Sequence, residues 1–385
     1  MTLRVDTDGR CMGRALSLAR RAEGFTRPNP AVGAVLTKNG QLLGEGWHHA
    51  AGMPHAEIEA LADCWRRGNS PRGATLYVTL EPCSTTGRTP PCVEAIVAAG
   101  VARVVIGTLD PNPRHAGRAL RLLNDAGVAT SVGVREDEAR DLLAPFAKWI
   151  TTRRPFVSLK MAQSVDSAIA DADGRSKWIS CERSRSRVQL LRSRVDAVMV
   201  GVNTVLADDP SLLCRGARRN GVHWRVVMDT MARTPLSARV LSDGLAARTI
   251  VATALPETLP TPLSKPDADA FAARRAAIAA TGATVWSVAA GADGRLSIPA
   301  LLDRMGESEI MHVLCEGGSR VAGSLLAADA VDALHVVVAP LLLGDGSRPA
   351  FSGFSFTLDA ARRLALSRCE RIGPDVWLTY RRGRG

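Results

Sequence analysis

The stretch LEPCSTTGRTPPC (residues 80–92) places two cysteines nine positions apart, each directly after a proline. The earlier stretch PHAEIEA (residues 54–60) carries His55 at the expected start of a helix. Cys83 follows an expected strand, and Cys92 begins an expected helix whose entry suits the two prolines before it, because the missing N–H of proline is no loss in a first turn. One imidazole and two thiolates are the three protein ligands of a zinc site that keeps its fourth position for water.

Glu57 lies two residues beyond this histidine, where a carboxylate can face the water on a metal without binding the metal. Zinc makes bound water acidic near neutral pH, so Glu57 could pass the proton to a leaving amine. A His-x-Glu followed by Pro-Cys is the signature of zinc deaminases, although the usual form has two residues between the cysteines and this chain has eight. The alternatives are a closed structural zinc site and a pair of core cysteines. A closed site lacks an obvious fourth ligand, since His48 and His49 lie beyond a Gly-Met-Pro turn.

A chain of 385 residues is too long for one hydrophobic core, which predicts two domains. Residues 1–152 alternate helical and strand patterns around a hairpin signal at Asn39-Gly40, as expected of an α/β sandwich with helices on both faces of a mixed sheet. Residues 153–385 then form a second α/β domain. Its first and last strands are expected at FVSLKMA (residues 156–162) and DVWLTYRR (residues 375–382).

The composition of the chain limits the kinds of molecule that it is expected to bind. The net charge of +11 suits small anionic substrates such as phosphates, or simply aids solubility, while an aromatic content of 4% disfavours a nucleic-acid binder. Eight scattered cysteines form no disulfide framework and favour a cytoplasmic location. The longest nearly apolar run, residues 334–344, contains a proline and is about half the length that crosses a bilayer, so no membrane anchor is expected.

Three stretches in one order, PNPAVGAV (residues 28–35), residues 44–61 and residues 77–92, make the first half resemble the riboflavin-pathway pyrimidine deaminases, whose variant spacing the cysteines share. The second half resembles the partner reductase of the same bifunctional enzyme, through SLKMAQSVD (residues 158–166) and CEGGSRVAGSLL (residues 315–326) among others. The resemblance covers nearly the whole chain. It implies a cytidine-deaminase-like α/β/α sandwich followed by a dihydrofolate-reductase-like α/β domain.

The same resemblance implies the chemistry and the site residues. The first domain would be a zinc-dependent deaminase of 2,5-diamino-6-ribosylamino-4(3H)-pyrimidinone 5′-phosphate, and the second would use NADPH to reduce the ribosyl group to ribityl. The zinc ligands would be His55, Cys83 and Cys92, with Glu57 as proton carrier; the deaminase substrate positions would be Asn29, His48, Arg88 and Thr89. The reductase substrate positions would be Lys160, Ser176, Arg192, Leu212, Arg215 and Glu316. The NADP positions would be Trp178, Ser180, Thr204, Asp208, Gly318, Ser319, Arg320, Val321, Ala322, Gly323 and Ser324.

Some of these positions also make sense from their own chemistry. A guanidinium at Arg88, inside the zinc loop, suits a phosphate. The pattern in which a strand ends at Glu316, two glycines turn the chain and a helix begins can offer backbone N–H groups to a cofactor's phosphates, although a plain tight turn has the same pattern. The resemblance also implies a homo-oligomer built through the reductase halves.

The second half departs from that family at four positions. Ser167, Ala168, Ala333 and Leu341 stand where the family usually has a glycine, a basic residue, a glutamate and a lysine, and in the zinc loop Thr85 replaces a histidine. Each change in the second half removes a charge or a flexible backbone position. An alternative is therefore a paralogue with altered or lost reductase activity that supplies the same pyrimidine intermediates to an azapteridine (toxoflavin-type) pathway. Two further alternatives are a nucleic-acid base deaminase and a non-catalytic, zinc-stabilised binding protein.

Overall fold

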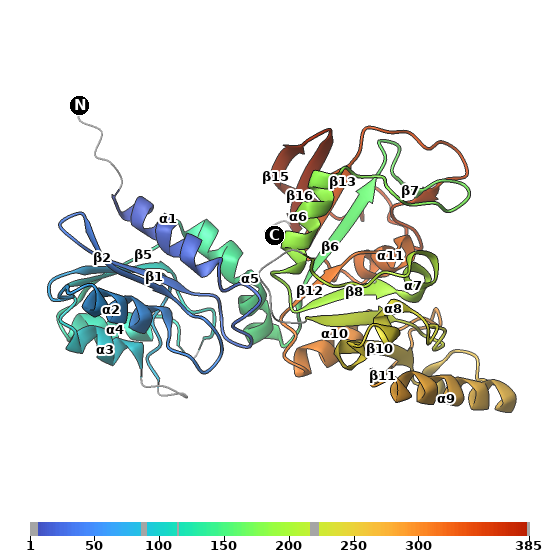
Figure 1. Cartoon of the computed structure of the whole chain (residues 1–385), viewed down its shortest axis with the longest axis horizontal. Helices are drawn as coiled ribbons and strands as arrows, with labels where there is room; N and C mark the ends of the chain where they lie inside the picture. The colour runs from blue at the N-terminus through green and yellow to red at the C-terminus, as the bar shows by residue number, and fades with distance from the viewer. Residues whose placement is uncertain (1–6, 86–90, 114, 216–222, 383–385) are drawn as a thin grey trace. The chain divides into compact units, whose positions relative to one another are not determined.

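The protein divides into two compact units, Met1–Arg153 and Arg154–Gly385. The structure is a computed structural model that describes residues 7–85, 91–113, 115–215 and 223–382 (Figure 1). Both units alternate helices with strands, so the predicted α/β fold class is confirmed. None of the helices in these ranges is long and apolar enough to cross a bilayer.

The first unit is built on a mixed five-stranded sheet. Its strands are β1 (Gly33–Lys38), β2 (Gln41–Trp47), β3 (Thr75–Leu80), β4 (Arg103–Thr108) and β5 (Ala129–Val132), in the order β2-β1-β3-β4-β5. Strand β1 is antiparallel to β2 and β3, whereas β3, β4 and β5 are parallel. Asn39 and Gly40 join β1 to β2 with positive φ angles of 50° and 78°. The predicted two-residue hairpin is therefore confirmed.

Helices cover both faces of this sheet. They are α1 (Thr7–Ala19), α2 (Ala56–Arg66), α3 (Cys92–Ala98), α4 (Arg118–Asp125) and α5 (Glu136–Thr152). Side chains alternate along each strand: Leu76 and Val78 pack with α2, α3 and α4, while Tyr77 packs with α1 and α5 on the other face. This places the starts of α2 and α3, which carry two of the expected metal ligands, on one face of the sheet.

The second unit has a nine-stranded sheet in the order β11-β10-β9-β8-β12-β6-β13-β16-β15. The strands are β6 (Phe156–Gln163), β8 (Ala197–Gly201), β9 (Trp224–Met228), β10 (Thr249–Ala254), β11 (Thr284–Val288), β12 (His312–Cys315), β13 (Ala333–Val338), β15 (Leu364–Ile372) and β16 (Asp375–Arg382). The run from β11 to β13 is parallel, and β16 and β15 are antiparallel additions. The predicted last strand agrees with β16. Strand β15 and the short pair β7 (Ala168–Ala170) and β14 (Arg348–Pro349) were not predicted.

Apolar side chains bury both faces of this sheet. The helices are α6 (Glu182–Arg192), α7 (Val202–Asp208), α8 (Arg239–Ser242), α9 (Lys265–Ala280), α10 (Ile298–Glu307) and α11 (Ser319–Ala327), with short 3-10 turns at Ala246–Arg248 and Pro256–Thr258. Leu301 of α10 and Leu325 of α11 belong to the core of one face, and Phe271 of α9 to the core of the other. Strands β8, β12 and β6 are adjacent and parallel, so their carboxyl ends meet at one edge of the sheet. Open parallel sheets bind ligands at such an edge.

Candidate metal centre and reductase site

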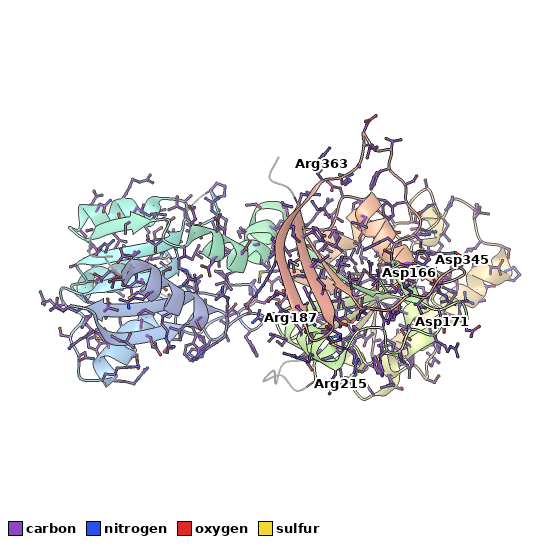
Figure 2. All side chains as sticks on the ribbon, turned by 90° about the horizontal axis from the view of Figure 1, so that it is seen from above. Asp166, Asp171, Arg187, Arg215, Asp345 and Arg363 are labelled. Atoms are coloured by element: carbon purple, nitrogen blue, oxygen red, sulfur yellow. The ribbon has the colours of Figure 1, made fainter. Side chains whose placement is uncertain are left out.

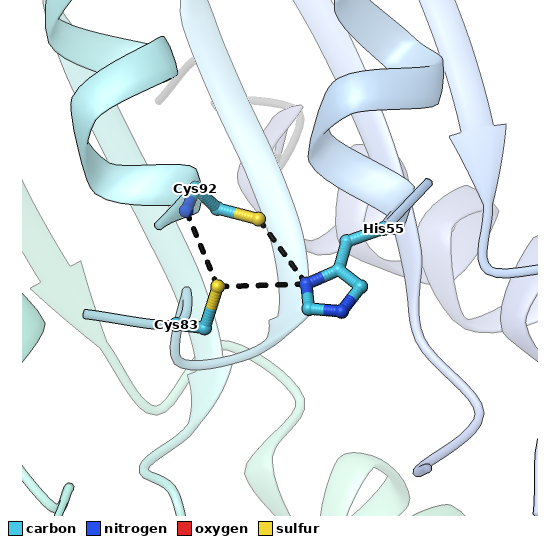
Figure 3. A group of neighbouring side chains, drawn as sticks. All are labelled: His55, Cys83 and Cys92. Atoms are coloured by element: carbon cyan, nitrogen blue, oxygen red, sulfur yellow. Dashed lines mark hydrogen bonds between the residues drawn. The ribbon is translucent and has the colours of Figure 1, made fainter. Parts of the chain in front are cut away.

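The three predicted metal ligands converge in the first unit (Figure 3). His55 precedes the first turn of α2, Cys83 follows β3, and Cys92 is the first residue of α3. His55 Nδ1 lies 3.5 Å from Cys83 Sγ and 3.3 Å from Cys92 Sγ, and the three donor atoms are all within 4.8 Å of one another. Zinc–sulfur bonds of about 2.3 Å and zinc–nitrogen bonds of about 2.0 Å place N and S about 3.5 Å apart around a tetrahedral ion. The residues therefore fit zinc.

The two thiols share hydrogen bonds that favour a thiolate at Cys83. The Cys92 backbone N–H donates to Cys83 Sγ at 3.2 Å. A hydrogen bond from the Cys92 thiol, together with His55, lowers the pKa of Cys83 to about 4, and the same shared proton raises the pKa of Cys92. A thiolate is the form in which cysteine binds a metal.

Glu57 lies in the first turn of α2 with only 3% of its surface exposed. Burial, reinforced by the nearby Cys83, raises the pKa of this carboxyl to about 7. Its side chain also hydrogen-bonds Cys92, so it sits beside the ligand group without belonging to it. A carboxyl group that titrates near neutral pH can both take up and release a proton under working conditions.

Two of the expected deaminase substrate positions come together beside the ligand histidine. His48 Nδ1 donates to the Pro54 carbonyl at 3.0 Å, which leaves Nε2 to accept from Asn29 Nδ2 at 3.0 Å. The His48 ring stands edge-on to His55 with 5.2 Å between ring centroids. Burial lowers the pKa of His48, in keeping with this neutral form. The other two expected positions, Arg88 and Thr89, lie outside the described residues.

Glu81, which the sequence analysis had not singled out, ties this site to the next segment of the unit. Its carboxylate is 5% exposed. Oxygen Oε2 accepts from the backbone N–H groups of Asp110 and Gly117 at 3.1 and 2.9 Å, and Oε1 accepts from that of Ala119 at 3.0 Å. Glu81 thus holds the end of β3, two residues before Cys83, against the segment that leads into α4. Its position in the same short stretch was visible, but its partners lie 29 to 38 residues away.

Three expected reductase substrate positions meet at the sheet edge of the second unit. Lys160 is on β6, Glu316 follows β12, and Arg192 ends α6. Arg192 Nη2 donates to Glu316 Oε2 at 2.8 Å. Burial acts to raise the pKa of Glu316, but Arg192 outweighs it and the pKa is lowered. Burial also lowers the pKa of Lys160, against the attraction of Glu316. The three form one charged group whose members are each half-buried.

The remaining expected substrate positions are arranged differently. The Ser176 hydroxyl donates to Asp208 Oδ1 at 3.1 Å, which links a substrate position to a cofactor position. The Leu212 side chain is 1% exposed and packs in the core, so only its backbone is available to a ligand. Arg215 is exposed, on the part of the second unit where Figure 2 also labels Arg187.

Two of the expected NADP segments begin side by side. Thr204 and Asp208 are on α7, which follows β8, and Gly318 precedes α11, which follows β12. A Cβ added at Gly318 would lie 3.5 Å from Thr204 Oγ1, so the two helix starts are in close contact. Trp178 is 67% exposed with the Arg185 guanidinium 4.5 Å from its ring, and the Ser180 carbonyl accepts from the same guanidinium.

The rest of the run from Gly318 to Ser324 divides between surface and core. The Ser319 hydroxyl hydrogen-bonds that of Ser352 at 2.9 Å. Ala322 is fully buried, and a Cβ at Gly323 would lie 1.8 Å from the Ser352 carbonyl oxygen. These two residues serve packing. Arg320 is exposed, while Val321 and Ser324 are half-buried.

The residues that depart from the family pattern can also be placed. Ser167 has a φ of 64°, a conformation that glycine adopts without strain. Ala168 and Ala333 are buried, in β7 and β13, and Leu341 is half-buried and accepts from the Val165 N–H at 2.9 Å. Asp166 accepts from the N–H groups of Leu343 and Gly344, so the β6–β7 turn is fastened to segment 341–344. Figure 2 shows Asp166 on the same side of the unit as Asp171 and Asp345. Thr85 is a half-buried bend residue.

The fold and the sites define a deaminase unit, with a His/Cys/Cys cluster whose geometry fits a metal ion, joined in one chain to a reductase unit. Residues 5–108 match the cytidine and deoxycytidylate deaminase zinc-binding region, and residues 155–378 match the RibD C-terminal domain. The chain belongs to the RibD family of riboflavin biosynthesis proteins, which are bifunctional deaminase–reductase enzymes. The predicted family is confirmed.

Relatives span nearly the whole chain. It is 37% identical to the riboflavin biosynthesis protein RibD of Aquifex aeolicus, covering 98% of this chain and 99% of the relative, and 38% identical to that of Escherichia coli, covering 95% and 97%. Among solved structures, the diaminohydroxyphosphoribosylaminopyrimidine deaminase/5-amino-6-(5-phosphoribosylamino)uracil reductase of Thermotoga maritima matches with a TM-score of 0.82 at 33% identity, covering 98% and 99%. The RibD structure of Acinetobacter baumannii, form 1, gives a TM-score of 0.81 at 34% identity over the same shares.

Proposed function

We propose that this enzyme removes an amino group from 2,5-diamino-6-ribosylamino-4(3H)-pyrimidinone 5′-phosphate with a zinc-dependent first unit, and then reduces the ribosyl side chain to ribityl with NADPH in the second. The observation that carries the proposal is the convergence of His55 Nδ1, Cys83 Sγ and Cys92 Sγ within 4.8 Å, beside a buried Glu57. The family provides the substrate class, since the relatives are riboflavin biosynthesis proteins.

In the first unit, His55, Cys83 and Cys92 would hold the metal. Bound zinc supplies a Lewis acid that lets water act as a nucleophile at neutral pH. Glu57 takes up a proton on a carboxylate oxygen and delivers it to the leaving amino group, so that ammonia departs as a neutral molecule. His48 fixes the Asn29 amide by its hydrogen bond, and the two together orient the substrate.

In the second unit, the cofactor would lie at the adjoining starts of α7 and α11, with Thr204, Asp208 and Gly318 against it. NADPH supplies the hydride that reduces the ribosyl carbon. The group of Lys160, Arg192 and Glu316 would contact the sugar side chain, and the exposed Arg215 suits the substrate phosphate because a guanidinium can bind phosphate with two parallel hydrogen bonds.

Metal analysis and two assays on one preparation test both halves. We expect bound zinc, release of ammonia from the pyrimidine phosphate that stops after chelation, and oxidation of NADPH when the deaminated intermediate is supplied. The chelated enzyme is the matched control, because it should lose ammonia release and keep NADPH oxidation. Protein that carries no metal, or that releases ammonia after complete chelation, would contradict the first half. A flat NADPH trace beside an active deaminase would contradict the second and favour the branch-pathway paralogue.

We further infer a homo-oligomeric, cytoplasmic enzyme, from the family and from the scattered cysteines. Sedimentation of the purified chain tests the first inference. A mass of about 41 kDa in solution would contradict it, because that is the mass of one chain.

A further inference from the structure

In the segment from Asp209 to Arg215, two residues adopt a backbone conformation that they do not prefer, Asp209 with a φ of 42° and Leu212. Leu212 has a φ of 54°, and its side chain is buried. A left-handed backbone costs a residue with a Cβ roughly 1–2 kcal/mol, and such strain persists only where the surroundings determine it. Leu212 and Arg215, which we assign to the reductase substrate site, both lie on this segment.

Three consecutive carbonyl oxygens of the segment accept hydrogen bonds from long basic or imidazole side chains. Arg225 Nη1 donates to Ser211 O at 3.4 Å, His223 Nε2 donates to Leu212 O at 2.8 Å, and Arg192 Nη1 donates to Leu213 O at 2.9 Å. The first two donors come from β9 and the residue before its first position, and the third comes from α6. The segment is therefore held from two elements at once.

The donors are themselves fixed. Arg225 is fully buried and donates from Nη2 to the carbonyl oxygens of Val240 and Leu245 at 2.9 and 2.7 Å, and it pairs with Asp243. His223 is 2% exposed. Arg192 pairs with Glu316, so the position of Leu213 is linked directly to the charged group at the sheet edge.

On the α6 side, the Arg215 backbone N–H donates to Gln189 Oε1 at 2.8 Å. This bond fixes the backbone position from which the exposed side chain of Arg215 extends. The path from His223 through the Leu212 carbonyl to Arg215 spans three residues of backbone, so a change at His223 acts on the substrate site without touching the substrate.

We propose that His223 and Arg225 are positioning residues of the reductase, which hold the segment Asp209–Arg215 so that Arg215 and the Arg192–Glu316 pair meet the phosphorylated substrate together. This inference rests on the proposed reductase function. It assigns the two residues an effect on substrate affinity rather than on the hydride-transfer step.

His223→Leu tests the proposal, because it removes the donor while keeping a buried side chain of similar volume. Arg225 is less suitable, since its loss would also remove the hydrogen bonds that it donates to Asp243 and to the carbonyl oxygens of Val240 and Leu245. We expect the KM of the reductase step to rise about fivefold to tenfold, the effect of one lost hydrogen bond, with kcat reduced less than about threefold. His223→Gln, which can donate from its amide nitrogen to the same carbonyl, should return KM to within about twofold of the original value. The deaminase KM of the same chain should not change.

His312→Leu is the matched control. This substitution also removes a side-chain hydrogen bond, the one between His312 Nε2 and Ser158 Oγ at 2.9 Å. His312 begins β12, whereas Glu316 follows the other end of that strand, about 13 Å away at about 3.3 Å per residue. Its reductase KM should stay within about twofold. An unchanged KM in His223→Leu, or an equal rise in His312→Leu, would overturn the proposal.

Hydrogen exchange separates this inference from the proposed function. If the unmodified enzyme fails to oxidise NADPH, the proposed function fails, and exchange of the backbone amides from 209 to 215 then decides the positioning role. Faster exchange there in His223→Leu, with exchange in β12 unchanged, supports it. Unchanged exchange in the segment would refute it.

Discussion

Glu81→Gln changes one atom of a buried carboxylate and is expected to lower the free energy of unfolding of the first unit by about 3–5 kcal/mol. The carboxylate receives three backbone N–H groups, those of Asp110 and Gly117 on Oε2 and that of Ala119 on Oε1. A glutamine offers one oxygen and one NH2 group. In its better orientation it keeps the first two hydrogen bonds and turns the NH2 group toward the Ala119 N–H.

The magnitude follows from these three contacts. A hydrogen bond to a charged acceptor contributes about 1.5–3 kcal/mol and one to a neutral acceptor about 0.5–1.5 kcal/mol, so the two surviving bonds together lose about 2 kcal/mol. The Ala119 N–H, which is buried, then lacks its acceptor at a further cost of about 1–3 kcal/mol. The loss affects the residues that follow β3 and lead to Cys83, so zinc affinity should fall with stability.

Thermal unfolding of the full chain, followed by calorimetry, measures the effect. For units of this size each 1 kcal/mol moves the midpoint by about 2–4 °C, so the transition of the first unit should fall by at least about 6 °C. Glu94→Gln is the control, since Glu94 is exposed on α3 and its loss should cost about 0.5 kcal/mol or less. A midpoint for Glu81→Gln within about 2 °C of the original would refute the reasoning from the hydrogen bonds.

Substitutions at three other positions have definite expected results. Glu57→Gln should keep its zinc and lower kcat for ammonia release by about 10²–10⁴, while the reductase of the same chain is unaffected; full turnover in the zinc-loaded variant would exclude the proton-carrying role. The hydrogen bond from Arg103 lowers the pKa of Asp8, so the stability that this pair contributes is present above about pH 4 and is lost as the pH falls. The difference in urea stability between the enzyme and Arg103→Gln should therefore shrink below about pH 4. A difference that stays constant with pH would contradict this role of the Arg103–Asp8 pair. Because Ser167 has a positive φ, Ser167→Val should lower the free energy of unfolding by about 1–2 kcal/mol, whereas Ser167→Gly should change it by no more than about 0.5 kcal/mol. Equal unfolding midpoints for the two variants would show that the turn is not strained.

The candidate metal centre could be predicted because its residues stand in short motifs, His-x-Glu at a helix start and Pro-Cys after a strand, that match the zinc-deaminase signature. The motifs identify the ligands even though His55 lies 28 and 37 residues from the two cysteines. The same holds for the hairpin at Asn39-Gly40, where two residues fix the turn. The charged group of Lys160, Arg192 and Glu316 was reached through the family resemblance, since no spacing along the chain indicates that these three meet.

Long-range features escaped prediction for identifiable reasons. Glu81 and His223 act through backbone groups, which carry no sequence identity. Strand β15 is exposed along nearly its whole length, so no alternation of apolar and polar residues marks it. Helix α10 did have a signal, a Ser297 cap followed by a proline in the first turn, that the sequence analysis overlooked.

The order of strands in the second unit also affects how this unit folds while the chain is being synthesised. Strand β6 emerges early, yet both of its neighbours, β12 and β13, are made long afterwards; Ser158 and His312, which bond across one of these pairs, are separated by 154 residues. The last strand to be synthesised, β16, belongs between β13 and β15 rather than at a border. The nascent chain therefore exposes the apolar strand β6 until translation is nearly complete. We expect this unit to fold slowly and to bind chaperones during synthesis.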